Sequence, residues 1–400
     1  MTALPVSPGH ARPGGRPGQP GDPGRPALSD RLPYPWLFPL LVFAATWVLI
    51  VAAWYGSDAI YGQAHPWTWH FVFKDAKYYL AIAEHGYKRT SPFPWPRGGS
   101  EIDRRTAFFP LFPLVIRAAS YVTGGNYLIA GLAVSVLAGA ASAVGVWVLA
   151  ARLCGRRIAD RAVALYCFFP GAMTFGMLYS EPLAVALGAA ALLALLDRRW
   201  LAAGIIGAVA TAERPTMIIL VAVSGVAAAQ AIWSRREWIA LIAPALTPLG
   251  MLAFFGYLGH RYHNYGFWFR VERDGWKQHV GWGEHTLRIM LWADPGTTQY
   301  ALYNVLLIAM FVAAVAGIAM MLAARLPVPV SLFAILAVLS CVVSSDESTK
   351  PRFVWAAFPI FIGAAAKLPR FLYWPVLVLS AASLAFLIGW WPNHYFGPAP

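Results

Sequence analysis

The stretch that decides the fold is Lys74–Arg117, KDAKYYLAIAEHGYKRTSPFPWPRGGSEIDRRTAFFPLFPLVIR, a charged and aromatic segment in a very apolar chain. It lies between two hydrophobic segments, Tyr34–Trp54 and Tyr127–Leu153, each long enough to cross a bilayer as a helix. A polar segment between two such spans is typical of a loop at the membrane surface. We therefore expect the rest of the chain to hold this loop at one face of a membrane.

The composition of the whole chain indicates an integral membrane protein. Of its 400 residues, 59% are hydrophobic and 12% are charged, and its mean hydropathy is +0.56. These polar residues are too few to cover a soluble globule, so we expect an all-α bundle that crosses the membrane many times. The net charge of +13 comes from short basic clusters between apolar segments, which favours contact with anionic membrane lipids over nucleic acid.

The two ends of the chain differ in character. Residues 1–33 are rich in Pro, Gly and Arg and lack the apolar region of a cleavable signal, so we expect a disordered cytoplasmic tail. Residues 34–400 should then form one polytopic transmembrane domain. Its three cysteines, Cys154, Cys167 and Cys341, lie in or beside apolar spans without CxxC spacing. They predict neither a disulfide nor a zinc site.

About eleven membrane spans are expected from runs of roughly 17–25 apolar residues, with shorter runs where Pro or Gly interrupts. The predicted spans are Tyr34–Trp54, Tyr127–Leu153, Ala162–Leu178, Pro182–Leu196, Trp200–Ala212, Pro215–Trp233, Trp238–Gly259, Tyr300–Ala324, Val328–Ser345, Phe353–Ala366 and Phe371–Trp391. With the N-terminal tail in the cytoplasm, every short connection on the inside carries Lys or Arg, as the positive-inside rule requires. This orientation places the conspicuous acidic, arginine and aromatic motifs on the extracytoplasmic face, where we expect a cavity between the spans.

Two long outside loops carry most of the polar residues. In the first loop, we expect an interfacial helix at Asp75–Gly86 and an interfacial or re-entrant helix at Ala107–Tyr121, joined through the Pro/Gly segment Ser91–Ser100. The second loop, Tyr257–Trp292, holds four tryptophans and four histidines. The tryptophans suit interfacial anchoring or stacking on sugar rings. The histidines lack HxH or HExxH spacing, so no metal site is predicted.

Asp75 is the candidate catalytic residue. As a carboxylate at the start of an interfacial helix, between Lys74 and Lys77, it could accept a proton from a substrate hydroxyl. A helix cap or a salt bridge to Lys77 is the structural alternative. Lys74, together with Glu84 and His85 at the other end of the same helix, is included in the candidate substrate-binding set.

Cations at the outer edges of the spans complete the candidate site. If several converged on a cavity, they could hold a lipid-linked phosphate or diphosphate, and each Arg could bind it with a bidentate fork. Snorkelling to lipid headgroups is the alternative for each one. Glu181 and Glu213 lie at similar edges and could pair with an arginine or take part in catalysis. The cations are Arg104, Arg105, Arg214, Lys350 and Arg352.

Five segments in this order resemble the PIG-V type of mannosyltransferase, within the GT-C class of membrane glycosyltransferases. They are DAKYYLAIAEHGY (75–87), AFFPLFPLVIR (107–117), FFPGAMTFGMLYSEPL (168–183), AERPTMIIL (212–220) and TKPRFVWAAFPIF (349–361). The resemblance implies an inverting enzyme that takes a sugar, typically mannose, from a polyprenyl-phosphate donor. The acceptor would be a lipid or glycan hydroxyl. Such a donor needs no nucleotide-binding glycine-rich loop, none occurs, and no cofactor is expected.

The resemblance also assigns roles by motif position. It implies that Asp75 is the catalytic base, that Tyr179–Glu181 and Glu213–Pro215 lie at the edge of the cavity, and that Arg352 is the arginine near the late outside loop. At Lys74 the chain departs from related sequences, which usually have Trp before the Asp. Because Lys74 is next to the implied base, this difference bears on the shape of the acceptor site or on the identity of the acceptor.

A transporter or flippase of a lipid-linked saccharide is the main alternative. It should carry polar residues near the middle of its spans, whereas the spans here are almost uniformly apolar. The Ala/Gly/Pro/Arg-rich composition resembles that of proteins from high-GC bacteria, which predicts a bacterial plasma membrane with the active site facing outward. In a eukaryotic endoplasmic reticulum the same face would lie in the lumen.

Overall fold

The computed structural model describes residues 27–62, 65–87, 104–291, 301–345 and 350–394. This part of the chain is helical, with one isolated bridge between Val280 and Ser344. The α-helices are α1 (Leu37–Tyr61), α2 (Trp67–Phe71), α3 (Ala76–His85), α4 (Leu111–Ser120), α5 (Tyr127–Cys154), α6 (Arg156–Phe168), α7 (Glu181–Leu196), α8 (Trp200–Thr211), α9 (Ile219–Arg235), α10 (Ile242–Leu246), α11 (Leu249–Tyr262), α12 (Phe267–Arg270), α13 (Glu284–Met290), α14 (Ala301–Ala323), α15 (Val328–Val343), α16 (Pro351–Ala356), α17 (Pro359–Lys367) and α18 (Arg370–His394). Short 3-10 turns include η1 (Ser29–Arg31), η2 (Arg104–Ala107), η3 (Pro170–Gly176), η4 (Pro215–Ile218) and η5 (Trp238–Leu241), and η6 (Val271–Gly275) is a π-helical turn.

The chain is an all-α integral membrane protein, as predicted, but the count of eleven spans is not confirmed. Within the described ranges, six helices are long and apolar enough to cross a membrane, or seven if η3 and α7, which meet at 109°, form one broken span. The six are Leu37–Tyr61, Tyr127–Cys154, Pro215–Arg235, Trp238–Tyr262, Asn304–Ala323 and Arg370–Gly389. The predicted span Ala162–Leu178 breaks at Pro170, and Phe353–Ala366 breaks before Pro359, because proline cannot donate the helical hydrogen bond.

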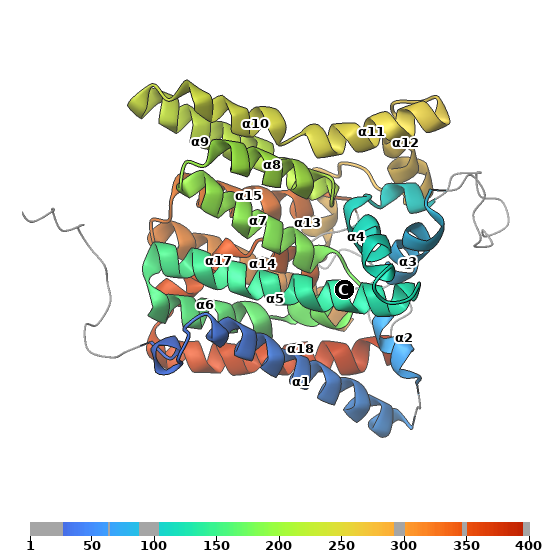
Figure 1. The fold of residues 1–400 in the computed structure, drawn as a ribbon. Helices are drawn as coiled ribbons and strands as arrows, with labels where there is room; N and C mark the ends of the chain where they lie inside the picture. The colour runs from blue at the N-terminus through green and yellow to red at the C-terminus, as the bar shows by residue number, and fades with distance from the viewer. Residues whose placement is uncertain (1–26, 63–64, 88–103, 292–300, 346–349, 395–400) are drawn as a thin grey trace, which may run out of the picture.

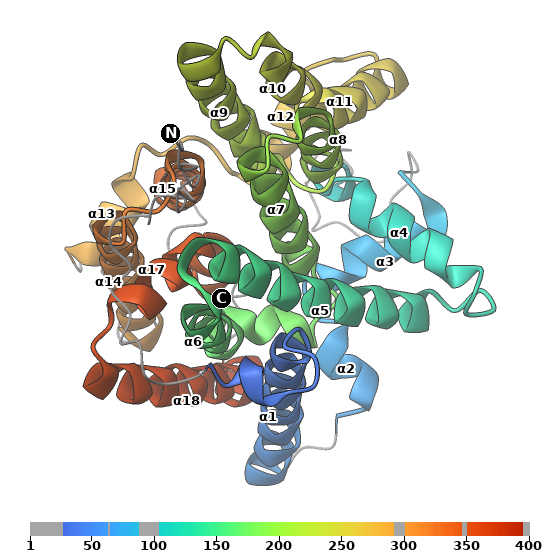
Figure 2. The ribbon, with the colours of Figure 1, turned by 60° about the vertical axis from the view of Figure 1, so that its left-hand side comes forward.

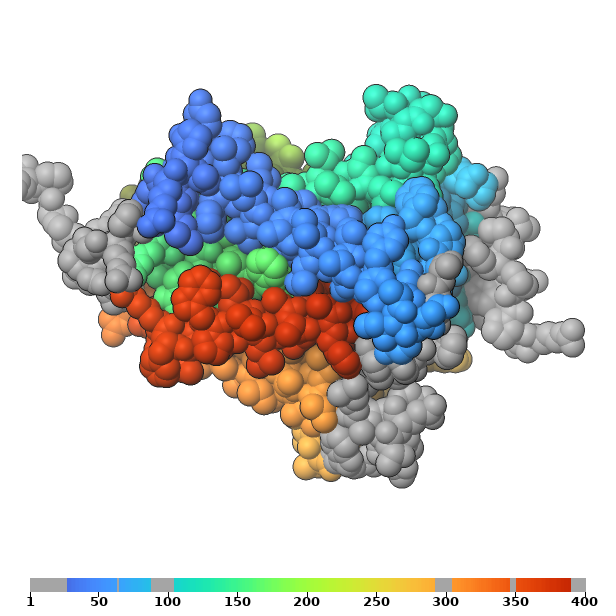
Figure 3. Space-filling view, turned by 90° about the horizontal axis from the view of Figure 1, so that it is seen from below, coloured from blue at the N-terminus to red at the C-terminus, as the bar shows by residue number. Residues whose placement is uncertain are grey.

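The long helix α5 lies at the centre of the bundle. Figure 2 shows α7 between α5 and α8, and α5 also packs along α6 and α1. The face that α5 buries is rich in Gly, Ala and Ser, which allows neighbouring helices to approach closely. At Gly139, for example, an added Cβ would overlap the ring of Phe43 on α1. Helices α1 and α18 lie side by side on one face of the molecule (Figure 3).

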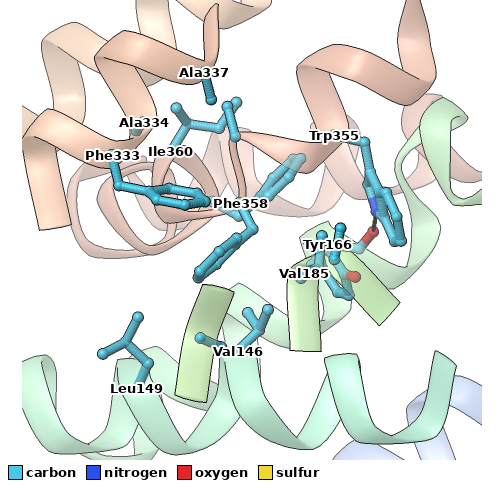
Figure 4. Packing of buried hydrophobic residues seen from close by; sticks show 14 of the residues in the cluster. Val146, Leu149, Tyr166, Val185, Phe333, Ala334, Ala337, Trp355, Phe358 and Ile360 are labelled. Carbon is cyan, nitrogen blue, oxygen red and sulfur yellow. Dashed lines mark hydrogen bonds between the residues drawn. The ribbon is translucent and has the colours of Figure 1, made fainter. Parts of the chain in front are cut away.

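Aromatic packing fixes α16 against the bundle (Figure 4). Trp355 stacks on Tyr166 of α6 at 4.6 Å between ring centroids and donates its indole N–H to the Tyr166 carbonyl oxygen at 2.9 Å. Nearby, Phe358 packs against Phe333 of α15. Gly171 of η3 also lies against α16, so closely that a Cβ there would overlap the Pro351 carbonyl oxygen. The start of α16 is therefore held in a fixed place relative to α6 and α15.

The last residues of the predicted tail belong to the folded part. The backbone N–H of Ser29 donates to Asp160 Oδ2 at 2.9 Å, and Arg156 pairs with Asp30 at 2.9 Å. These contacts place the chain from residue 27 onward against α6. Residues 1–26 of the predicted tail lie outside the described residues.

The first long loop contains both predicted helices, now seen as α3 and α4, at one end of the bundle (Figure 1). Arg117 of α4 donates through Nε to the carbonyl oxygen of Ala83 at 2.6 Å and through NH2 to that of Glu84 at 3.1 Å. These two acceptors belong to the last turn of α3, whose carbonyl groups have no partners within the helix. Arg117 therefore ties the end of α3 to α4. The Pro/Gly segment Ser91–Ser100 lies outside the described residues.

Candidate active site

Four elements far apart in the sequence bring charged side chains together at the loop end of the bundle. Arg352 NH1 lies 2.6 Å from Asp75 Oδ2 and 3.6 Å from Glu181 Oε1. Arg214 NH2 lies 3.3 Å from the same Glu181 oxygen. The four side chains thus form a row of alternating charge from Asp75 through Arg352 and Glu181 to Arg214. With the adjacent Glu213, we call this group the charge cluster.

Proline residues place three members of the charge cluster at helix starts. Glu181 is the first residue of α7 and precedes Pro182, Arg214 precedes Pro215 at the start of η4, and Arg352 follows Pro351 at the start of α16. Proline is favoured in the first turn of a helix because the N–H that it lacks would have no partner there. Asp75 is likewise the residue before α3, although its side chain makes no capping hydrogen bond.

The two glutamates of the charge cluster are buried and its other members are partly buried, yet several of their polar atoms have no hydrogen-bond partner among the described residues. Glu181 and Glu213 are 2% and 1% exposed. Among the described residues, no acceptor reaches Nε or NH1 of Arg214 or Nε of Arg352. A buried donor without an acceptor costs about 1–3 kcal/mol. Guanidinium groups with free N–H groups beside a cavity are suited to bind an anion.

Burial and neighbouring charges shift the pKa values of the charge cluster in different directions. Burial raises the pKa of Glu213 to about 8, and the nearby Arg214 only partly offsets it. Burial disfavours the charged form of Arg214, but the Glu181 and Glu213 carboxylates outweigh it and raise its pKa above the usual value. In the same way, Asp75 and Glu181 outweigh the burial of Arg352 and raise its pKa. Both arginines therefore stay charged at any physiological pH.

A cavity of about 710 Å³ opens beside the charge cluster. Its volume lies within the range typical of small-molecule sites. Polar and aromatic side chains share its wall, and one of them, Tyr79, hydrogen-bonds to the Ser180 hydroxyl at 2.8 Å. Its lining residues are Asp75, Tyr79, Ala107, Phe108, Phe109, Glu181, Glu213, Arg214, Pro215, Thr216, Trp268, Phe269, Glu272, Arg273, Trp276, Gln278, His279, Val280, Ser340, Val343, Ser344, Arg352 and Phe353.

The second long loop closes one side of this cavity. The indole N–H of Trp268 donates to the Ala107 carbonyl oxygen at 3.2 Å, and that of Trp276 donates to the Arg104 carbonyl oxygen at 3.3 Å. At its other end the loop pairs with the end of α15, where the Gly281 N–H donates to the Val343 carbonyl oxygen at 2.8 Å. The two long loops, predicted separately, therefore form one continuous wall.

The tryptophans of the second loop do not share one environment. Trp268 and Trp276 line the cavity, whereas Trp282 is 84% exposed. Trp292 lies outside the described residues. Trp268 and Trp276 thus lie where a tryptophan could stack on a sugar, whereas Trp282 lies where it could anchor the loop at an interface.

Five of the eleven predicted site residues line the cavity, namely Asp75, Glu181, Glu213, Arg214 and Arg352. The other six, whose side chains are described, do not line it. Glu84 and His85 lie at the far end of α3 with exposed side chains, 3.6 Å from each other. Lys74 has its amino group 5.5 Å from the centre of the Phe73 ring, and burial lowers its pKa.

Lys350 and two arginines of η2 lie close to the cavity without lining it. Lys350 is buried at the residue before α16. Arg104 places its guanidinium 5.5 Å from the centre of the Trp276 ring, and Arg105 is 1% exposed. Any role of these three in binding substrate stays a prediction.

The sequence interpretation missed several polar residues. Tyr79 and Ser180 join α3 to the start of α7, and Ser180 lies inside a motif already singled out at residues 179–181. A second polar group was missed entirely, because the predicted first span ended at Trp54, whereas α1 continues to Tyr61 and includes Asp58. Its carboxylate contacts His65 Nδ1 at 3.0 Å and His70 Nε2 at 3.2 Å. A single acid within an apolar span was the signal that could have revealed it.

No protein-family model matches the sequence, and no curated protein sequence matches it. The fold, in contrast, is similar to two crystal structures of ArnT from Cupriavidus metallidurans. The one bound to undecaprenyl phosphate has a TM-score of 0.53 at 15% identity and matches 86% of this chain. The apo structure has a TM-score of 0.51 at 16% identity and matches 85%. The chain spans 63% and 61% of those two chains. These similarities concern the fold alone, and they agree with the predicted GT-C-like helical bundle.

Proposed function

We propose that this chain is an inverting glycosyltransferase that moves a hexose, mannose, from a polyprenyl-phosphate donor to a hydroxyl group of a lipid-linked or envelope glycan. The observation that carries the proposal is the cavity of about 710 Å³, where the Asp75 carboxylate contacts Arg352 and where both Arg352 and Arg214 have N–H groups without an acceptor among the described residues. A transfer of this kind needs one base and a cationic site for the leaving phosphate. The similarity to ArnT bound to undecaprenyl phosphate supports a donor of the same class.

The chemistry follows from the positions of the charges. Asp75 removes the proton of the acceptor hydroxyl, and the oxygen attacks the anomeric carbon on the face opposite the phosphate. The bond between the anomeric carbon and the phosphate oxygen breaks, and the electron pair leaves with the polyprenyl phosphate. Arg214 and Arg352 stabilise the charge of that product. Because phosphate is already a good leaving group, the reaction requires no general acid.

The position of Arg352 implies that the donor binds before the acceptor. The Arg352 guanidinium donates to the Asp75 carboxylate at 2.6 Å, so it competes with an acceptor hydroxyl for the same oxygen. A donor phosphate at Arg352 competes in turn with Asp75 for the guanidinium N–H groups. Donor binding would therefore free the base, and the acceptor would bind second.

The family and the cellular location of the chain also belong to the proposal. We assign the chain to the PIG-V type of GT-C enzyme on the five sequence segments described above. We place it in a bacterial plasma membrane with the cavity facing outward, which agrees with the basic residues of the opposite, short connections. The six other candidate residues, Lys74, Glu84, His85, Arg104, Arg105 and Lys350, are proposed to contact substrate from outside the described cavity wall.

The test uses purified protein in nanodiscs, given radiolabelled polyprenyl-phosphate mannose and a lipid extract from a high-GC bacterium. Transfer of label to a new lipid or glycan product is the expected result. A parallel series with other polyprenyl-phosphate hexoses tests the sugar separately from the reaction. Protein in sealed liposomes that moves labelled donor across the bilayer without forming product would contradict the transferase and support the flippase.

A further inference from the structure

Two members of the charge cluster, Glu181 and Glu213, take no part in the proposed reaction, and of these only Glu213 lacks an ion pair with an arginine among the described residues. Glu213 lies in the turn between α8 and η4, lines the cavity, and is 1% exposed. No hydrogen bond of ordinary geometry reaches either carboxylate oxygen from another described residue. The nearby Ser180 hydroxyl, which favours the charged form of Glu213, also pairs with the Tyr79 hydroxyl at 2.8 Å. A buried carboxylate without firm partners is costly as an anion and much less so as a neutral acid.

The charges around Glu213 are already balanced without it. Arg214, in the same turn, pairs with Glu181 of α7, and Arg352 of α16 pairs with Asp75 and Glu181. Two cations therefore meet two anions, and an ionised Glu213 would add an unpaired negative charge. Tyr79 of α3 faces this group as a neutral hydroxyl, since burial raises its pKa. The second loop contributes Glu272, Arg273 and His279 to the same cavity wall.

An incoming phosphate changes what this site needs. Its oxygen atoms accept hydrogen bonds, and the buried N–H groups of Arg214 and Arg352 that lack acceptors are the donors available to it. An ionised Glu213 beside these arginines would repel the phosphate. A neutral Glu213 would add one more O–H donor.

We propose that Glu213 holds a proton when the donor binds and donates a hydrogen bond from it to an oxygen of the donor phosphate, next to Arg214 and Arg352. This inference rests on the proposed function and adds a phosphate-binding residue to it. The proton stays on Glu213 throughout, so no bond to it is formed or broken in the transfer. Glu213 is thus a binding residue for the phosphate and not a second base.

The proposal predicts how phosphate affinity depends on pH. Burial raises the pKa of Glu213 to about 8, so the protonated form predominates at pH 7 and is scarce at pH 9.5. If only that form binds, affinity should fall about 30-fold between these two pH values. A phosphomonoester has its second pKa near 6, so the ligand itself does not account for a change above pH 7.

The experiment measures binding of undecaprenyl phosphate to the full chain in nanodiscs at pH 7.0 and 9.5. Because Trp268 and Trp276 line the cavity, intrinsic fluorescence is a suitable readout. The wild type should lose affinity about 30-fold, whereas Glu213→Gln, which cannot ionise and still has an N–H donor, should bind equally well at both pH values. Glu284→Gln changes an exposed glutamate paired with Arg288 and should behave like the wild type. Thermal unfolding confirms that each variant is folded.

Other results of the binding experiment would overturn either the role of Glu213 or the proposed function itself. Wild-type affinity that does not change with pH, or a loss of affinity that persists in Glu213→Gln, overturns the role of Glu213 and leaves the proposed function standing. Loss of binding by folded Glu213→Gln at pH 7.0 also overturns it, because the site would then need a carboxylate. If the wild type binds no undecaprenyl phosphate at either pH, the proposed function itself fails.

Discussion

Replacing Asp75 with Asn should nearly abolish sugar transfer while leaving the protein folded. The asparagine has the same shape and keeps an oxygen that can accept the 2.6 Å hydrogen bond from Arg352, but it cannot take a proton. A general base contributes typically 10²–10⁴-fold to a rate. We expect turnover to fall about 10³-fold, which corresponds to about 4 kcal/mol in the activation barrier.

The cost to stability should be much smaller. A hydrogen bond that involves a charged group contributes about 1.5–3 kcal/mol, and a neutral one about 0.5–1.5 kcal/mol. The difference, about 1 kcal/mol, is the expected loss in the free energy of unfolding, because Arg352 keeps its contact with Glu181 at 3.6 Å. A loss of this size leaves the folded population nearly unchanged, so it cannot produce a 10³-fold loss of turnover.

The assay compares initial rates of label transfer from the polyprenyl-phosphate sugar, with protein in nanodiscs and thermal unfolding measured in parallel. The matched control is Asp197→Asn, which weakens an exposed ion pair with Arg152 at 3.2 Å and should leave turnover unchanged. Wild-type turnover by folded Asp75→Asn would refute the assignment of Asp75 as the base.

Two further variants test how the loop helix and α16 are positioned. Arg117→Ala removes two hydrogen bonds to the last turn of α3, including the one to Ala83, and should lower the free energy of unfolding by about 1–3 kcal/mol. Hydrogen exchange of the α3 amides should then rise more than that of the α5 amides. Equal rises in the two helices would contradict this role of Arg117. Gly171→Ala places a Cβ against the Pro351 carbonyl oxygen and should destabilise the protein by about 1–3 kcal/mol and reduce transfer, whereas Gly256→Ala has open space and should match the wild type in both measurements.

Much of the fold could be predicted from hydrophobic run length alone, because backbone groups in a bilayer must be satisfied within helices. The same signal cannot tell a span from a short buried helix. Trp200–Thr211, for example, is as apolar as a span, yet its 12 residues reach only about 18 Å at 1.5 Å per residue. Run length also does not show that the helices break at Pro170 and Pro359, because a helix in a membrane protein can continue past a proline where neighbouring groups satisfy the freed backbone.

The candidate site was predictable where a local signal existed. Glu181, Arg214 and Arg352 each adjoin a proline at the edge of an apolar run, and all three line the cavity. Their convergence on Asp75 is a tertiary property that no local pattern contains. Glu84, nine residues beyond Asp75, lies about 14 Å farther along α3 at the helical rise, so closeness in sequence did not bring it to the cavity.

The ion pair between Asp75 and Arg352 joins residues 277 positions apart, and this separation matters for how the protein is made. A membrane protein is synthesised from its N-terminus, so α3 and its carboxylate exist long before α16 emerges. Until then, Asp75 and Glu181 both lack the arginine that they share in the finished protein. A chain that stops before Pro351 would retain five of the six long apolar helices and still be unable to assemble its charge cluster. The charge cluster can therefore form only after α16 has been synthesised.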